Sequence, residues 1–70
     1  MPSVPAERRM ANDIARQFRH LPPAEGAEAV ASHVRRFWDP TMRARLVHLA
    51  ETDGESLDPL ARAAAARLKP

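Results

Sequence analysis

The chain has 70 residues and a formal net charge of +2, with 11 basic and 9 acidic side chains and no cysteine. A chain of this length forms one domain at most, so we expect a single small domain over residues 1–70. The absence of cysteine excludes disulfides and thiolate zinc sites, and the near balance of charge argues against the strongly basic face of a DNA-binding module. Because a core of this size gives marginal stability, we expect a partner protein to supply the rest.

Residues 1–4 are expected to form a loose N-terminus, and the first helix is predicted to begin at Pro5. Apolar side chains then recur at spacings of four, four and three residues, namely Met10, Ile14, Phe18 and Leu21. This is a helical period. The pair Pro22-Pro23 ends the helix, since proline cannot continue the backbone hydrogen bonding.

The second helix is predicted to run from Pro23 to Phe37. Proline suits the first helical position, where its missing N–H costs nothing. The expected apolar face consists of Ala27, Val30, Val34, Phe37 and Trp38.

The pair Asp39-Pro40 predicts a sharp start for a third helix. Proline favours extended backbone angles in the residue before it, and an N-cap residue adopts such angles. We therefore expect Asp39 to cap the helix with its carboxylate. Thr52-Asp53-Gly54 should end the helix, whose apolar side carries Met42, Leu46 and Leu49.

A fourth helix is predicted from Pro59 to about Leu68, with Asp58 as its N-cap, because Asp58-Pro59 repeats the pattern of Asp39-Pro40. Its expected apolar side carries Leu60, Ala64 and Leu68. The run Ala63–Ala66 favours helix but offers little bulk for a core, so we expect this helix to lie flat against something else. With no alternating β-branched run, the prediction is an all-α fold, a small cluster of three to four short helices.

The side chains that carry catalysis or bind metals do not occur in a productive spacing. His20, His33 and His48 lie 13 and 15 residues apart, which is not the spacing of two ligands on one helix. None of the serines lies in a nucleophile elbow, and the two glycines are too far apart to cradle a phosphate. We therefore predict no catalytic, cofactor-binding or metal-binding residue in this chain, which is not an enzyme by itself.

The segment around Trp38 is the candidate for binding a partner. It holds the single tryptophan, and tryptophan and arginine are enriched among interface hot spots. Trp38 is either a core residue or an anchor presented to a partner, and the two roles can combine. The predicted partner-binding residues are Arg35, Arg36, Trp38, Met42 and Arg43.

Two further interpretations concern nucleic acid and membranes. The second and third helices could form a helix-turn-helix, but Pro40 occupies the turn, no glycine is present there and no long basic run occurs. Nucleic-acid binding stays open only as a weaker alternative. The uncharged runs are shorter than the ~20 residues that span a bilayer, and Arg8-Arg9 is not followed by the apolar stretch of an export signal. We expect a cytoplasmic protein with no membrane contact.

Three segments resemble a known family. They are Met10-Ala11-Asn12 followed by Ile14-Ala15, then His33 with Phe37-Trp38-Asp39-Pro40-x-Met42-Arg43, then Leu57-x-Pro59-Leu60. Together they resemble the delta subunit of NAD-dependent, molybdenum-containing formate dehydrogenases, over about residues 8–68. Phe-Trp-Asp-Pro-x-Met-Arg is the specific part of the resemblance.

The resemblance implies an accessory subunit of a cytoplasmic complex that oxidises formate and reduces NAD. Such complexes carry a molybdenum–pterin centre and iron–sulfur clusters on the alpha subunit, and FMN, further clusters and the NAD site on beta and gamma subunits. The expected task of this chain is to dock on the alpha subunit and support assembly, stability or cofactor retention. A transient maturation factor for insertion of the molybdenum cofactor is an alternative that the sequence does not separate from this.

Overall fold

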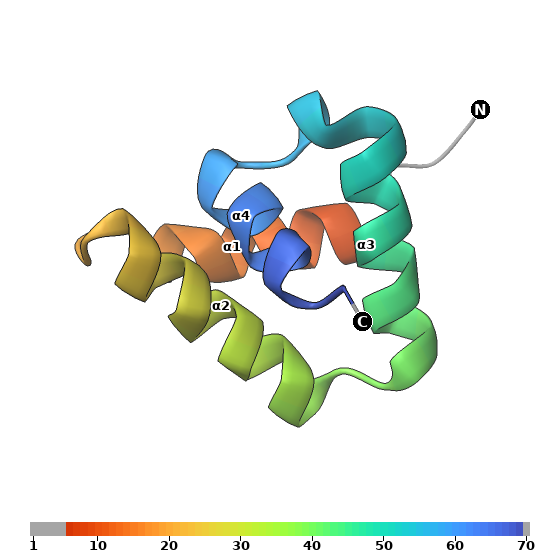
Figure 1. Cartoon of the computed structure of the whole chain (residues 1–70), viewed down its shortest axis with the longest axis horizontal. Coiled ribbons are helices and arrows are strands. Elements are labelled where there is room, and N and C mark those ends of the chain that lie inside the picture. Colours follow the sequence, from red (N-terminus) through yellow and green to blue (C-terminus); the bar gives the residue numbers. More distant parts are fainter. Residues whose placement is uncertain (1–5, 70) are drawn as a thin grey trace.

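The structure, a computed structural model, describes residues 6–69 of the chain. These residues form four α-helices and one short 3-10 turn (Figure 1). The elements are α1 (Ala6–Gln17), α2 (Pro23–Phe37), α3 (Pro40–Asp53), η1 (Gly54–Ser56) and α4 (Pro59–Arg67). No strand occurs in this part of the chain, and the all-α prediction is confirmed. The expectation of a loose N-terminus at residues 1–4, and of a helix starting at Pro5, lies outside the described residues.

Helix α1 ends earlier than the apolar pattern predicts. The pattern extends to Leu21, but the helix stops at Gln17 and the chain continues in turns. In these turns Phe18 N–H donates to Ala15 O and Leu21 N–H donates to Phe18 O, both at 3.1 Å. Pro22 explains the difference, because a proline ring clashes with the carbonyl four residues before it in a helix. Phe18 still packs half-buried against the core, and Leu21 is half-buried.

Helix α4 occupies the centre of the fold and packs against α1, α2 and α3 (Figure 1). Its buried residues are all alanines: Ala61, Ala64 and Ala65. The contact with α2 is the most extensive, and the buried residues of α2 include the small Gly26, Ala27 and Ala31. The predicted apolar side of α4 is confirmed, since Ala64 is buried and Leu60 and Leu68 lie half-buried against the core. Small side chains are needed here because the helix is enclosed by three others.

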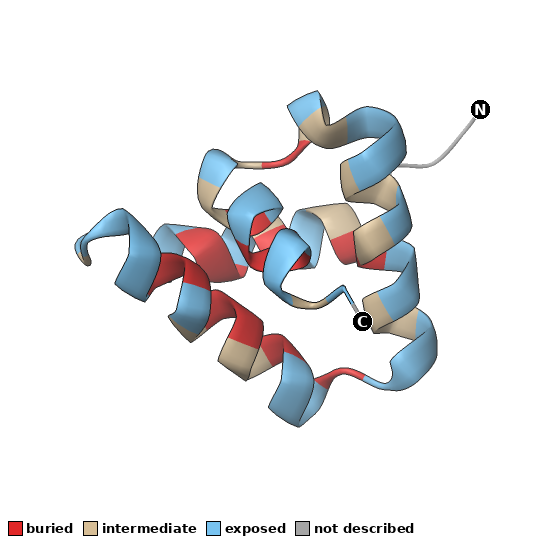
Figure 2. Ribbon diagram, viewed as in Figure 1, coloured by how far each residue is buried: buried red, intermediate tan, exposed pale blue. Residues whose placement is uncertain are grey.

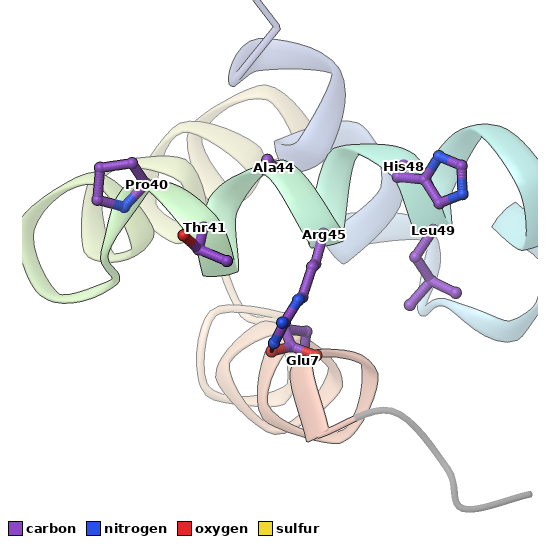
Figure 3. A pocket seen from close by; sticks show the side chains of 7 residues that line it. All are labelled: Glu7, Pro40, Thr41, Ala44, Arg45, His48 and Leu49. Carbon is purple, nitrogen blue, oxygen red and sulfur yellow. Dashed lines mark ion pairs between the residues drawn. The ribbon is translucent and has the colours of Figure 1, made fainter.

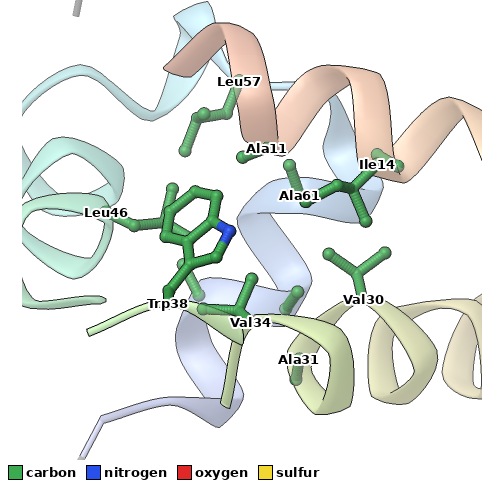
Figure 4. Packing of buried hydrophobic residues seen from close by; sticks show 12 residues of the cluster. Ala11, Ile14, Val30, Ala31, Val34, Trp38, Leu46, Leu57 and Ala61 are labelled. Atoms are coloured by element: carbon green, nitrogen blue, oxygen red, sulfur yellow. The ribbon is translucent and has the colours of Figure 1, made fainter. Parts of the chain in front are cut away.

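The larger core side chains surround this alanine-rich centre (Figure 4). Leu46, Val30 and Val34 are the largest fully buried side chains, and Ile14, Trp38 and Leu57 complete the cluster. The apolar stripe of α2 is thus confirmed at Ala27, Val30 and Val34. The prediction is wrong for Phe37, which was expected on this buried stripe but is 69% exposed.

Candidate docking surface

Trp38 forms part of the core. It lies between α2 and α3 with only 6% of its surface exposed, and its backbone N–H donates to Val34 O at 2.9 Å. Its indole ring packs among Val34, Leu46 and Leu57 (Figure 4). Of the two roles considered for Trp38, the structure places it in the first, with one edge reaching the surface notch described below.

Both predicted N-cap carboxylates accept hydrogen bonds from the helices that follow them. Asp39 has extended backbone angles, and its Oδ1 accepts from Met42 N–H at 2.8 Å. Asp58 Oδ1 accepts from Leu60 N–H at 2.9 Å, while its Oδ2 pairs with Arg19. Burial acts to raise the pKa of Asp58, but the bonds from Arg19 and Leu60 N–H and the charges of Arg19 and Arg16 outweigh it, so the pKa lies below its usual value.

A notch of about 500 Å³ opens at the surface where α1, the end of α2 and the start of α3 meet. We call it the Phe37 notch; it is lined by Met10, Asp13, Ile14, His33, Phe37, Trp38 and Met42. Phe37 and Met10 are the two exposed large apolar residues among residues 6–69, at 69% and 38% exposure. The last residues of α2, Arg35 to Phe37, are exposed, whereas the next residue, Trp38, is buried (Figure 2).

Phe37 is exposed because of its place on α2. It lies at the edge of the buried stripe and is the last residue of the helix, so the neighbouring helices cover only part of it. Its ring contacts polar neighbours on its own helix. The His33 ring centroid is 4.8 Å from that of Phe37, and the Arg36 guanidinium carbon is 5.7 Å from the Phe37 centroid, within the range of a cation–π contact.

The five predicted partner-binding residues do not share one surface. Trp38 and Met42 line the Phe37 notch, and Arg36 lies against its Phe37 ring. Arg35 donates to Glu28 on its own helix at 3.0 Å and to Arg67 O on α4 at 3.3 Å. Arg43 lines a different groove on α3 with Val47 and Leu68.

Glu28 receives two arginines on the side of the molecule where α2 faces α4. Arg35 Nη1 lies 3.0 Å and Arg67 Nη1 3.2 Å from its carboxylate oxygens. The hydrogen bond from Arg35 lowers the pKa of Glu28, against a smaller effect of desolvation, and the Arg35 charge and the Arg67 bond lower it further. Arg35 is therefore engaged within the chain.

A second groove, of about 650 Å³, lies between the start of α1 and α3 (Figure 3). Glu7 and Arg45 face each other across it at 3.5 Å, so their charges are matched. The imidazole of His48 is directed away from this pair (Figure 3). Thr41, His48 and Glu7 line the groove, but no hydrogen bond joins their side chains within residues 6–69.

Between residues 6 and 69, no three histidine, aspartate or glutamate side chains converge as metal ligands would. No described helix has both the length and the apolar character required to cross a bilayer.

Of the seven residues that line the Phe37 notch, the sequence predicts only Trp38 and Met42 as partner-binding, and it assigns no role to Asn12. Met10 and Phe37 were assigned to buried stripes and His33 to no role. Their positions on the helices could have indicated exposure, because Met10 and Phe37 lie at the edges of the apolar stripes of α1 and α2. Asn12 joins α1 to the segment before α4, since it donates to Ser56 O at 3.3 Å and accepts from Asp58 N–H at 2.7 Å.

A family model matches most of this chain. The family model described as NADH-dependent formate dehydrogenase delta subunit, FdsD, matches residues 9–65. No curated protein and no solved structure shows a significant match. The matched region runs from α1 into α4 and includes the Phe37 notch and both N-cap aspartates. The chain therefore belongs to the delta subunit family of NADH-dependent formate dehydrogenase.

Proposed function

We propose that this chain is a non-catalytic accessory subunit of a cytoplasmic, molybdenum-containing, NAD-dependent formate dehydrogenase. In this proposal it docks on the alpha subunit, within a complex that also contains beta and gamma subunits, and supports assembly, stability or cofactor retention. The observation that carries the proposal is the exposed Phe37 in a chain of the delta subunit family. Phe37, at 69% exposure, lies in the same notch as the second exposed large apolar residue, Met10, and a shared exposed apolar surface of this kind is typical of an interaction site.

The redox groups of such a complex are expected on the other subunits. Cysteine thiolates hold iron–sulfur clusters, and this chain has no cysteine, so its residues do not fit such a cluster. The described histidines and carboxylates do not converge either. The proposal therefore assigns no molybdenum–pterin, FMN or NAD contact to this chain.

Co-purification tests the proposal. The chain is co-expressed with an affinity-tagged alpha subunit and with beta and gamma subunits, and its molar ratio in the purified active complex is measured. A constant stoichiometric ratio supports an accessory subunit. Binding only to an alpha subunit that lacks its cofactor would instead support the maturation role, and absence from both forms would overturn docking altogether.

A non-catalytic role has its own test. The complex is purified with and without this chain, and formate oxidation is measured immediately and after incubation. Equal initial turnover per molybdenum, with faster loss of activity when the chain is missing, is the expected result. A complex that holds its full cofactor complement and yet shows no initial turnover without the chain would contradict the proposal.

A further inference from the structure

We propose that the Phe37 notch receives an apolar side chain of the partner subunit, with a carboxylate beside it that pairs with Arg36. This inference rests on the proposed function and adds to it the site and the chemistry of the contact. It names one occupant for the notch, an apolar and acidic segment of a protein partner. The notch has an apolar lining, a floor formed by the buried Trp38 and Ile14, and the charged Arg36 at its rim.

The lining is suited to an apolar side chain. Phe37, Met10 and Met42 come from three different helices and meet at the surface. Methionine side chains are flexible and polarisable, so they adapt to the shape of what enters. Covering Phe37 removes a large aromatic surface from water, and aromatic rings dominate the energetics of interfaces.

The floor of the notch is fixed before any partner arrives. Trp38 and Ile14 are both buried, at 6% and 8% exposure, and belong to the core cluster. The bond from Met42 N–H to Asp39 fixes the corner between α2 and α3 at the same place. A preorganised site loses less conformational entropy on binding than a flexible one.

The rim carries a positive charge that the described part of the chain does not neutralise. Arg36 is exposed and pairs with no carboxylate among residues 6–69. Asp13, the carboxylate within the notch, is already paired with Arg16 at 3.1 Å. Arg36 already lies against an aromatic ring, and a guanidinium in that position can still bind a carboxylate through its planar fork.

This charge also distinguishes a different protein from a second copy of this chain. A two-fold dimer through the notch would place the same surface on both sides, and both rims would be basic. Like charges facing each other in an interface cost free energy, whereas an acidic partner gains it. The notch therefore fits a heterologous, acidic partner.

Four substitutions test the inference in the co-expressed complex. Phe37→Ser removes the exposed ring, and Phe37→Leu keeps an apolar side chain. Arg36→Gln removes the charge and Arg36→Glu reverses it. Arg62→Glu is the matched control, because Arg62 is exposed on α4 and also pairs with no carboxylate in residues 6–69. The readout is the dissociation constant for the complex, with circular dichroism of each free chain as the check on folding.

We expect Phe37→Ser to weaken binding by about tenfold or more and Phe37→Leu by much less, as for a central apolar contact. Arg36→Glu should weaken binding more than Arg36→Gln, and Arg62→Glu should leave it within about twofold, as expected of a charge outside the interface. The wild-type affinity should fall between about 50 mM and about 300 mM salt, and this dependence should shrink in Arg36→Gln.

The results separate this inference from the proposed function. If the wild-type chain does not bind the complex, the proposed function fails. If the wild-type chain binds and Phe37→Ser binds equally well, only the assignment of the notch is overturned. Equal affinities for Arg36→Gln and Arg36→Glu would overturn the carboxylate, and a dimer of the free chain that Phe37→Ser abolishes would overturn the heterologous partner.

Discussion

The side-chain amide of Asn12 holds the backbone of Asp58 in place across the fold. Asn12 Oδ1 accepts from Asp58 N–H at 2.7 Å, and Asn12 Nδ2 donates to Ser56 O at 3.3 Å. These two bonds fix the segment that leads into α4. They give the Met-Ala-Asn segment of α1 a physical role: its asparagine positions the residue that caps the central helix.

Replacing Asn12 with alanine should destabilise the fold by about 1–3 kcal/mol, because a partly buried N–H and carbonyl lose their partner. Urea denaturation followed by circular dichroism measures the change. Gln17→Ala, an exposed position at the end of the same helix, is the control and should stay close to wild type. An Asn12→Ala midpoint equal to that of the control would contradict the role of the amide.

Replacing Asp39 with alanine should cost about 1 kcal/mol, because the bond to Met42 N–H at the start of α3 is lost. Asp39→Asn keeps an oxygen acceptor at the same place and should retain most of the stability. The free energies of unfolding of the two variants decide this. Equal losses would mean that the charge, and not the cap hydrogen bond, is what Asp39 contributes.

Asp58 should make stability depend on pH in the acidic range. Its pKa is lowered in the folded chain relative to an ordinary value of about 3.9. A lowered pKa contributes stability that is fully present above the unfolded pKa and is lost as the pH falls through the folded pKa. The advantage of wild type over Asp58→Asn should therefore be constant near neutral pH, shrink from about pH 4 downwards and vanish in stronger acid.

Urea midpoints across the acidic range measure this difference. Glu55→Gln removes a carboxylate that pairs with no arginine or lysine in residues 6–69, and serves as the control. A gap between wild type and Asp58→Asn that persists unchanged at low pH would show that the ion pair with Arg19 is not its cause.

Trp38 and Phe37 should respond in opposite ways although they are adjacent. Trp38→Ala empties a core position and should cost about 3–5 kcal/mol, a large share of the stability of so small a domain. Phe37→Ser changes a residue that is 69% exposed, and the helical circular dichroism signal and urea midpoint should hardly move. A Trp38→Ala chain as stable as wild type would contradict the core position of the indole. Loss of binding in Trp38→Ala would not by itself identify a contact, which is why Phe37 is the better test of docking.

Gly26→Ala should not give the gain of about 1 kcal/mol that glycine-to-alanine changes give in exposed helices. A Cβ at this position would lie 3.0 Å from Leu60 Cδ1 and 3.2 Å from the Phe18 carbonyl oxygen. Leu60 can turn aside, but the backbone at Phe18 is held by its bond from Leu21 N–H. We expect a loss of stability in urea denaturation, and a similar loss when the change is made in a Leu60→Ala background, because the Phe18 carbonyl is still in place. A clear gain in the single variant would show that the close packing there relaxes at little cost.

The local signals in the sequence predict the helix starts well. Asp39-Pro40 and Asp58-Pro59 each combine a cap with a proline at the first helical position, and α3 and α4 begin at those prolines. The end of α1 could not be predicted from periodicity, because the apolar spacing continues to Leu21 through turns that are not helical. There the effect of Pro22 on the preceding turn is stronger than the pattern.

The sequence shows which residues are apolar, but it does not show which of them the other helices leave exposed. Phe37 has the spacing of a core residue, and only the lengths and crossings of the other helices leave it exposed. Arg35, Arg36 and Arg43 are close in sequence, yet Arg35 faces Glu28, Arg36 faces Phe37 and Arg43 lines another groove. Such directions depend on how the helices cross, which no single segment specifies.

The central position of α4 has a consequence for synthesis. The three helices ahead of it in the chain contact one another less extensively than α2 contacts α4, and each of them packs against it. During synthesis, α1, α2 and α3 therefore lack the helix against which all three pack until α4 has been made. We expect the nascent chain to depend on chaperones, or on the neighbouring subunit, until that point.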